Sequence, residues 1–357
     1  MKLPTIAIVF ALASAVAVHA QTPRDGARAS FPVSPIQPDL TPGYVLIEGD
    51  IQVRMDEYLR LTLGGADGTY ATARYWTGGV VPYEFVTSGT GSVSVGNQNR
   101  AIAAMNAIAQ RAGVTFRPAN AQDPDRIRFQ NSSFNNSAVG PQGGAQIINI
   151  LNWTIQIVIC HEIYHSLGFH HEQSRWDRGS YVSINQDNIC GSGVTPACVA
   201  AVCCDCKDLA GTCVPCSFNF SIMDASTYGP YDFDSFMHYG RSDFSCNGQD
   251  TITVLQPWTT QWQSVIGQSD HFSKLDELTC RGLYPFANDR WLRASATSPF
   301  DGTFHHPYRT ISEAIPATPI NGTLFVDPGT YAVAAPQVPL SRPMTIRATY
   351  GEVTITP

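Results

Sequence analysis

The sequence has no block of basic residues, few charged side chains and, after its first 20 residues, no apolar run long enough to cross a membrane. Its 22 lysines and arginines stand against 29 aspartates and glutamates, which gives a formal net charge of -7. This balance argues against a nucleic-acid partner. Charged residues make up 14% of the chain and hydrophobic residues 43%, as in a folded globular protein. For 357 residues we expect two or three domains.

The first 20 residues have the composition of a secretory signal peptide. Lys2 precedes an apolar run over residues 6–18, and Val18-His19-Ala20 fits a small-residue cleavage site. A membrane anchor is the alternative, but the run is shorter than the ~20 apolar residues that a spanning helix needs. We therefore predict a signal peptide over residues 1–20, a secreted or extracellular protein, and no membrane span.

The rest of the chain changes composition several times. Residues 21–70 are interpreted as a pro-segment and linker, because 21–43 are rich in Pro, Ser and Ala and three glycines follow between 64 and 68. Residues 71–287 alternate strand and helix patterns, which predicts an α+β domain with a mixed sheet and packed helices. The expected strands are 81–86, 114–116, 127–129 and 145–151, and the expected helices are 97–111 and 153–167.

Three histidines in one short segment have the spacing of a metal site. His161 and His165 are four residues apart, so a helix places both rings on one face. Gly168 allows that helix to end in a conformation that other residues resist, and the chain can then return His171 as a third ligand. Imidazole suits Zn²⁺, and three protein ligands leave a position open, as in catalytic zinc sites. We predict one catalytic zinc ion held by these three histidines.

Glu162 is placed to act as a general base. It follows the first ligand, about 100° further around the helix, which brings its carboxylate near the ion without making it a ligand. Zinc would lower the pKa of a bound water from ~15.7 towards ~7. Glu162 would then take the proton of that water and pass it to the leaving amine of a peptide bond. His170 is one residue off the ligand spacing and is interpreted as a structural or surface side chain.

Other interpretations of this segment differ in what the metal does. The histidines could lie on a solvated helix face without any ion, but Gly168 and His171 at the required offsets fit that poorly. The chain could also be an extracellular glycan- or surface-binding protein with a structural metal site, or a metallohydrolase of another class. A structural site has no need of Glu162, so its presence favours catalysis on protein or peptide substrates.

On a larger scale the chain resembles the astacin family of metzincin proteases over about residues 76–284. Residues 161–172 match the extended zinc signature, 173–182 its continuation, and 229–240, Gly-Pro-Tyr-Asp-Phe-Asp-Ser-Phe-Met-His-Tyr-Gly, the Met-turn. The resemblance implies an α+β, metzincin-type fold with a mixed twisted sheet, an active-site helix and a Met-turn. We expect a short β-rich C-terminal segment after it.

The resemblance also implies roles for individual residues. Met237 would form a hydrophobic floor beneath the metal. Tyr239 would be a further zinc ligand that swings to stabilise the transition state. Glu172 would contact the new N-terminus after activation.

A short motif in the predicted pro-segment resembles the family's latency motif. In Gly49-Asp50-Ile51 the aspartate would occupy the open position on zinc in place of the catalytic water. An ordinary turn aspartate is the alternative, and the family's phenylalanine is replaced by Ile47. The resemblance implies a latent proenzyme that is activated by cleavage between Leu63 and Trp76.

The cysteines depart from the family pattern. Its two usual disulfides are absent, with Gly113 and Phe286 in place of one pair and Asn135 and about Trp153 in place of the other. Seven of the ten cysteines lie in an insert over residues 190–216, where a second zinc site or disulfides are possible and an exported protein favours disulfides. The cross-link candidates are the insert cysteines with Cys160, Cys246 and Cys280. Because Cys160 precedes the first ligand, it should point away from the metal and be structural.

The C-terminal segment, residues 288–357, has a composition of its own. It resembles the opening of a right-handed parallel β-helix of the pectate-lyase-like kind, which implies possible carbohydrate binding. The part that carries this resemblance, from about Ala294 to Pro357, has roughly 60 residues and would form only one or two coils, fewer than the three repeats that solenoids need.

Overall fold

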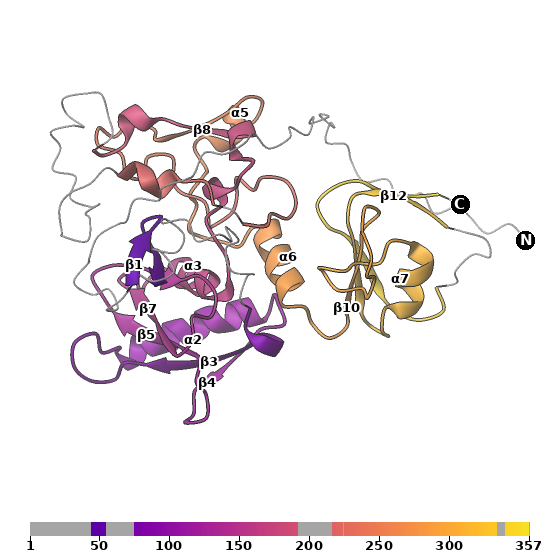
Figure 1. The fold of residues 1–357 in the computed structure, drawn as a ribbon, viewed down its shortest axis with the longest axis horizontal. Helices are drawn as coiled ribbons and strands as arrows, with labels where there is room; N and C mark the ends of the chain where they lie inside the picture. The colour runs from indigo at the N-terminus through magenta and orange to yellow at the C-terminus, as the bar shows by residue number, and fades with distance from the viewer. Residues whose placement is uncertain (1–43, 55–74, 192–215, 224, 334–339, 357) are drawn as a thin grey trace, which may run out of the picture. The chain divides into compact units, whose positions relative to one another are not determined.

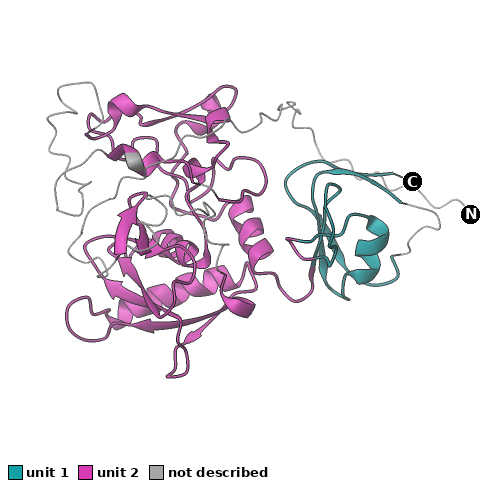
Figure 2. Ribbon diagram, viewed as in Figure 1, with its two compact units in different colours: residues 1–30, 290–302, 306–357 teal, residues 31–289, 303–305 magenta. Residues whose placement is uncertain are grey.

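The computed structural model describes residues 44–54, 75–191, 216–223, 225–333 and 340–356. The predicted signal peptide, nearly all of the predicted cleavage region and most of the cysteine insert lie outside these residues. The described residues form two units (Figures 1 and 2). The larger takes in those from 44 to 289 with 303–305, and the smaller those of 290–302 and 306–356.

A four-stranded parallel sheet organises the first half of the larger unit. Its strands lie in the order β4 (Thr115–Pro118), β3 (Val80–Phe85), β5 (Arg126–Asn131) and β7 (Ala145–Ile150). Side chains alternate across it: Ile127 and Phe129 of β5 are buried, whereas Arg126 and Arg128 on the other face pair with Glu84. One face of the sheet is thus apolar and carries helices, as the sequence predicts. The predicted mixed pairing is wrong for these four strands, because all of their pairings are parallel.

Two helices, α2 (Val95–Ala109) and α3 (Gln156–Leu167), contribute to the hydrophobic core over this sheet. Ser94 caps α2 by accepting a hydrogen bond from the Asn97 backbone. α2 ends at Ala109, two residues before its expected end, and α3 begins three residues later than expected. The element types agree with the sequence prediction, and only the boundaries differ.

A small mixed sheet lies next to α3 (Figure 1). Strand β1 (Tyr44–Ile47) pairs antiparallel with β2 (Ile51–Arg54), and β2 pairs in parallel with β6 (Ser137–Ala138). The pairing of Ile47 with Ile51 leaves residues 48–50 as the tip of a tight hairpin. This tip carries the aspartate that the sequence marks as a latency residue.

In the second half of the larger unit, the described residues form little regular structure. Strand β8 (Val182–Ile184) pairs antiparallel with β9 (Ile252–Val254), and both contribute to a second hydrophobic core. Helix α6 (Lys274–Leu283) begins at a capping box in which Ser273 and Asp276 satisfy each other's backbone N–H groups. The remaining helices are short: α5 (Thr259–Trp262), η1 (Thr77–Gly79), η2 (Glu172–Ser174), η3 (Arg178–Ser180), η4 (Gln186–Asn188) and η5 (Cys216–Phe220).

The smaller unit is built on parallel strand pairs. Strand β11 (Thr323–Val326) pairs with β13 (Thr345–Ala348), and β12 (Gly329–Ala332) pairs with β14 (Val353–Thr356). Strand β10 (Asp289–Leu292) extends the first pair, and helix α7 (Ile311–Ala317) contributes to the unit's own hydrophobic core. Parallel pairing is a feature of β-helices, and the β-helix assignment itself stays a prediction.

Among the described residues, none of the helices combines the length and the apolar character needed to cross a bilayer.

Candidate metal centre

Helix α3 positions two of the three histidines and ends where the third becomes reachable. His161 and His165 lie one turn apart on α3, and the helix stops at Gly168, whose φ of 110° is left-handed. A side chain at this position would be strained, which is why glycine is favoured at such helix ends. His171 follows directly before η2.

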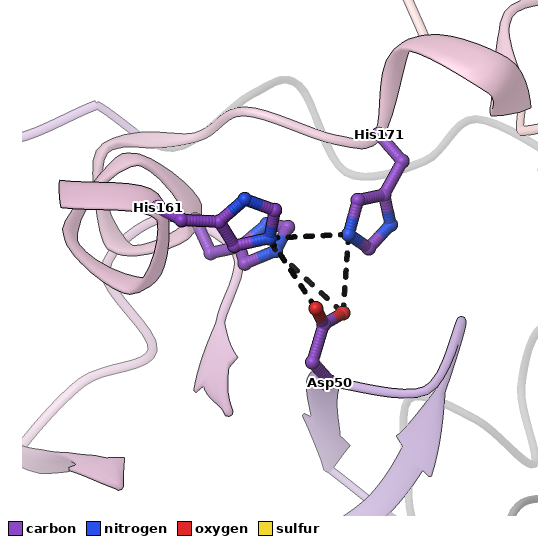
Figure 3. A group of neighbouring side chains, drawn as sticks. Asp50, His161 and His171 are labelled. Atoms are coloured by element: carbon purple, nitrogen blue, oxygen red, sulfur yellow. Dashed lines mark hydrogen bonds and ion pairs between the residues drawn. The ribbon is translucent and has the colours of Figure 1, made fainter. Parts of the chain in front are cut away.

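The side chains of His161, His165, His171 and Asp50 converge, with four donor atoms within 4.8 Å of one another. The Nε2 atom of His161 lies 3.0 Å from Nε2 of His165 and 3.3 Å from Nε2 of His171. Asp50 lies opposite, its carboxylate oxygens 3.3 Å from Nε2 of His161, 3.2 Å from that of His171 and 3.7 Å from that of His165. Figure 3 shows the Asp50 carboxylate approaching the histidines from the tip of the hairpin.

These separations fit a tetrahedral zinc ion. Zinc–ligand bonds of about 2.0–2.1 Å in tetrahedral geometry place neighbouring donors about 3.3 Å apart. The donor set is also one that zinc takes, three neutral imidazoles and a carboxylate. The structure therefore brings together the predicted ligands and the predicted latency aspartate in an arrangement that a single zinc ion can bridge.

The outward-facing nitrogens of the imidazoles are also engaged. Nδ1 of His161 donates to the Phe236 carbonyl at 2.9 Å, and Nδ1 of His165 donates to the Phe169 carbonyl at 2.8 Å. Nδ1 of His171 donates to a carboxylate oxygen of Glu48 at 2.8 Å. A proton on each Nδ1 leaves each Nε2 lone pair directed to the centre, as a metal ligand requires.

Burial and the charges of neighbouring side chains act against each other on the pKa values of Asp50 and His171. Burial works against ionisation of Asp50, but the three histidines outweigh it and lower the pKa of its carboxyl. Burial likewise opposes a charge on His171, yet without a bound cation Asp50 and Glu48 raise the pKa of that ring to about 10, so a metal ion would bind there in exchange for a proton. Burial and the neighbouring His161 lower the pKa of His165 well below its usual value. The carboxylates thus create a site that favours a cation.

Glu162 lies buried beside this cluster. Its Oε2 atom has no hydrogen-bond partner among the described residues. Burial, with a smaller contribution from the charge of Asp50, raises the pKa of the Glu162 carboxyl well above its usual value. A buried carboxyl with one oxygen unpartnered among the described residues is poised to exchange a proton with a molecule that enters the site.

The predicted Met-turn segment lies against the third ligand. The Met237 carbonyl accepts from the Glu172 N–H at 3.0 Å, and the Tyr239 ring lies 4.7 Å from that of His171 between centroids. Met237 and Tyr239 are both buried. The Tyr239 hydroxyl donates to the backbone carbonyl of Glu48, so the hairpin engages this side chain as well.

Asp276 supports the first ligand from α6, and sequence reasoning missed it. Its carboxylate accepts from the Ser235 hydroxyl at 2.7 Å and from the Phe236 N–H at 3.2 Å. The Phe236 carbonyl in turn holds His161. The only trace of this in the sequence is the capping pattern at the start of α6, which signals a helix and not a site.

Glu172 has partners within the described chain. It accepts from the Asp232 N–H at 2.8 Å and from the Arg175 guanidinium at 3.1 Å. Burial raises the pKa of its carboxyl to about 8, although Arg175 works in the opposite direction. The contact with a new N-terminus that the sequence suggests stays a prediction.

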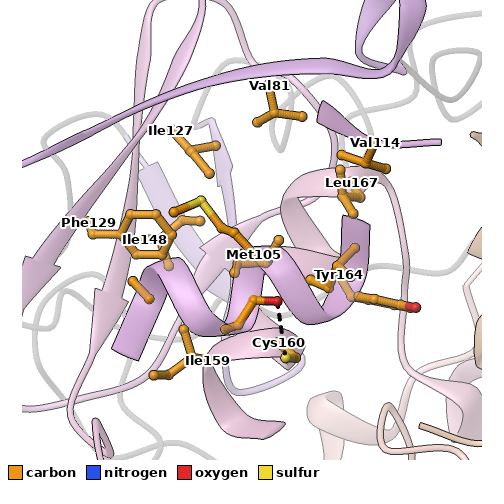
Figure 4. Packing of buried hydrophobic residues seen from close by; sticks show 14 of the residues in the cluster. Val81, Met105, Val114, Ile127, Phe129, Ile148, Ile159, Cys160, Tyr164 and Leu167 are labelled. Atoms are coloured by element: carbon orange, nitrogen blue, oxygen red, sulfur yellow. Dashed lines mark hydrogen bonds between the residues drawn. The ribbon is translucent and has the colours of Figure 1, made fainter. Parts of the chain in front are cut away.

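The opposite face of α3 is packed into the core (Figure 4). Cys160 lies there with its sulfur 3.9 Å from the Ala104 carbonyl, and both Cys160 and Cys280 are buried free thiols. Their proposed participation in cross-links is therefore wrong, because both are enclosed in the core among apolar side chains. Burial raises the pKa of each thiol to about 12. Cys190, Cys216 and Cys246 take part in disulfide bonds.

The positions of the two absent family disulfides are filled differently. A Cβ at Gly113 would lie 2.2 Å from the Pro285 carbonyl oxygen, so backbone packs on backbone there. At the other place the Asn135 side chain donates to Asn152 at 3.1 Å, one residue before the expected partner position.

A family model described as Astacin, a peptidase family, matches residues 68–195 and 217–285. The chain belongs to the astacin family. Zinc metalloproteinase nas-8 of Steinernema carpocapsae is 30% identical over 241 residues, which cover 66% of this chain and 51% of that protein. High choriolytic enzyme 2 of Oryzias latipes is 33% identical over 187 residues, covering 51% of this chain and 56% of that protein. The chain spans about half the length of such relatives.

Among solved structures, the chain is similar to high choriolytic enzyme 1, a hatching enzyme zinc-protease from Oryzias latipes. The two are 29% identical with a TM-score of 0.47, and the match covers 61% of this chain and 97% of that one. Astacin zinc metalloproteases use one catalytic zinc, which agrees with the donor set of His161, His165, His171 and Asp50.

Proposed function

We propose that this protein is a zinc-dependent endopeptidase that is exported and made as a latent proenzyme. The observation that carries the proposal is the convergence of three imidazole Nε2 atoms and the Asp50 carboxylate within 4.8 Å, next to the buried Glu162. Membership of the peptidase family supports the class of reaction. An unpartnered buried carboxyl also argues for catalysis over a purely structural metal site.

In the mature form, His161, His165 and His171 would hold the ion through Nε2. Zinc bound there supplies Lewis acidity, which polarises a peptide carbonyl and lowers the pKa of water. Glu162 accepts the proton of the attacking water and delivers it to the nitrogen of the leaving amine. Its raised pKa suits this cycle, because a carboxyl that is easily protonated can also return the proton.

Met237 and Tyr239 complete the proposed site. Met237 belongs to the hydrophobic core that also contains buried residues of α3, and we propose that it forms the floor beneath the ligands. Gly168 fixes the end of the ligand helix. Once the hairpin has left, the Tyr239 hydroxyl loses its Glu48 acceptor and is free to donate to the developing oxyanion of the substrate.

We infer latency from the place of Asp50. Its carboxylate oxygens lie 3.3 Å from Nε2 of His161 and 3.2 Å from that of His171, where they would exclude substrate and water while the hairpin is in place. We propose that cleavage after the hairpin, between Leu63 and Trp76, removes this block. Glu172 would then meet the new N-terminus, close to the Met-turn.

Export and a carbohydrate role for the last segment rest on the sequence. The signal-like residues 1–20 support secretion, and the parallel strand pairs of the smaller unit are compatible with a carbohydrate-binding β-helix opening. Calorimetry with soluble glycans on the full chain would show heats if the second proposal holds, and their absence would count against it.

The test of the main proposal combines metal analysis with peptide cleavage. Processed wild-type protein should contain one zinc per chain, cleave casein and a peptide library, and lose activity with a chelator. Glu162→Ala and Glu162→Gln should keep the zinc and lose activity by roughly 10²–10⁴-fold. Protein without stoichiometric zinc, or variants of Glu162 that cleave normally, would refute it.

A further inference from the structure

The three ligand histidines differ in the hydrogen-bond acceptor of their Nδ1 atom, on the side of the ring that faces away from the metal position. His161 and His165 donate through Nδ1 to backbone carbonyls, those of Phe236 and Phe169. These acceptors belong to the chain after residue 75 and remain whatever happens to the hairpin. His171 instead donates to the Glu48 side chain, which belongs to the hairpin. The third ligand is therefore oriented by the segment that activation would remove.

The hydrogen bond between His171 and Glu48 is buried on both sides. Glu48 is 1% exposed and His171 2% exposed, so water does not compete for the bond. The other carboxylate oxygen of Glu48 is buried and has no hydrogen-bond partner among the described residues. The Glu48 carboxylate is thus desolvated, and it accepts a side-chain hydrogen bond from the His171 ring.

The backbone of the hairpin tip is held in an unusual shape to make this contact. Glu48 has a φ of 49° and Gly49 a φ of 80°, both left-handed. A Cβ at Gly49 would lie 2.7 Å from the Phe244 ring, so the tip fits closely. In this shape residues 48–50 present two carboxylates to one metal centre, Asp50 in front of the His171 ring and Glu48 behind it. A left-handed non-glycine residue persists only where its surroundings hold it.

We propose that Glu48 is a positioning residue that retains zinc in the unprocessed chain. Its carboxylate fixes the His171 ring and makes the Nε2 lone pair a stronger donor, so zinc leaves the full chain more slowly than it would leave the same chain without this carboxylate. This inference rests on the proposed zinc site. Carboxylates behind ligand histidines commonly change metal affinity by about 10–100-fold.

The test follows zinc transfer from the loaded full chain to a chromogenic chelator. Glu48→Ala removes the acceptor, and Glu48→Gln keeps an uncharged acceptor oxygen in nearly the same volume. We expect Glu48→Ala to release zinc roughly 10–100-fold faster than wild type and Glu48→Gln to fall between them. Casein cleavage is measured on the same samples, and all three full chains should stay inactive because Asp50 is untouched.

Two further readouts separate a positioning role from a merely structural one. The proton on Nδ1 of His171 should give a strongly downfield NMR signal in the zinc-loaded wild type, lost in Glu48→Ala and shifted in Glu48→Gln. After cleavage and removal of the hairpin, wild type and variants become the same chain, so their zinc-release rates should coincide.

The outcomes distinguish this inference from the proposed function. A wild-type full chain that binds no zinc would refute the proposed function itself. Zinc bound normally but released at one rate from all three full chains would overturn the role of Glu48 and leave the protease proposal standing. Faster release seen only together with casein cleavage would mean that the whole hairpin had left, and this too would overturn the assignment to Glu48.

Discussion

The hydroxyl of Tyr239 donates a hydrogen bond to the backbone carbonyl of Glu48. The hairpin turn therefore makes three contacts with the site. The Glu48 carbonyl accepts from Tyr239, the proposed oxyanion donor, and the Glu48 carboxylate accepts from the third ligand, His171. Asp50 occupies the metal position. The contacts involve different atoms, so each can be tested separately.

Asp50→Ala should make the unprocessed chain partly active. The substitution opens the metal position but leaves the hairpin docked, so we expect casein cleavage above that of the wild-type full chain and below that of the processed protein. The rise should be roughly tenfold or more, because each ~1.4 kcal/mol of lost carboxylate binding raises the open fraction tenfold. Arg54→Ala, an exposed change at the end of the strand that follows the hairpin tip, should stay inactive. A silent Asp50→Ala chain with full zinc content would contradict the latency role.

Tyr239→Phe should slow the processed enzyme without emptying its metal site. Loss of one oxyanion donor lowers kcat by roughly 10²–10³-fold in other hydrolases, and we expect that range with zinc content unchanged. The matched control is Tyr231→Phe, a buried tyrosine whose hydroxyl lies 2.7 Å from Nε2 of His238. Equal kcat values for the two variants would show that Tyr239 has no special role.

Gly168→Ala should destabilise the larger unit by about 1–2 kcal/mol, the cost of a left-handed residue with a Cβ. The strain falls between the second and third ligands, so zinc should also be bound more weakly. Gly179→Ala is the control, because nothing lies within 4 Å of a Cβ there and its φ is not positive. Calorimetric unfolding of the two full-chain variants measures their stabilities. A Gly168→Ala chain as stable as the Gly179→Ala chain would contradict the prediction.

Acidification should destabilise the protein through His238. Burial lowers the pKa of this ring to about 4, against the opposing hydrogen bond to the Tyr239 carbonyl. The folded pKa lies below the unfolded value of about 6.5, so the stabilisation is present above pH 6.5 and is lost as the pH falls towards 4. The loss should approach about 3 kcal/mol, since each pKa unit corresponds to about 1.4 kcal/mol.

Melting curves between pH 7 and pH 4 check this expectation. His238→Gln should show a shallower loss of stability over that range than wild type. His271→Gln is the contrasting control: hydrogen bonds to Asp234 and Asp270 raise the pKa of this half-exposed ring, so its contribution has the opposite sign. Identical pH profiles of wild type and His238→Gln would show that another group controls acid stability.

Much of the site could be predicted because it is encoded locally. His161 and His165 are one turn apart in any helix, and Gly168 supplies the helix end, so a short segment is enough to infer three ligands. The strand and helix types around it follow from residue patterns of the same short range. The boundaries were less certain because capping and tertiary packing decide the last turns, as at the ends of α2 and α3.

The rest required contacts between distant segments. Cys160 and Cys280 were candidates for cross-links by count alone, but their burial among core side chains decides that they are free thiols. Asp276 lies more than a hundred residues from His161 and reaches it only through the Phe236 backbone. No spacing rule links such residues, since the loops between them set the geometry.

Residue spacing was enough to predict the metal ligands, the proposed base beside them and the peptidase family, because helical periodicity and a glycine stop act over a few residues. The groups that hydrogen-bond the outer nitrogens of the ligands depend on the folded chain. The Glu48 carboxylate meets the His171 ring because strand pairing bends residues 48–50 into a left-handed tip and the core holds that tip at the end of α3.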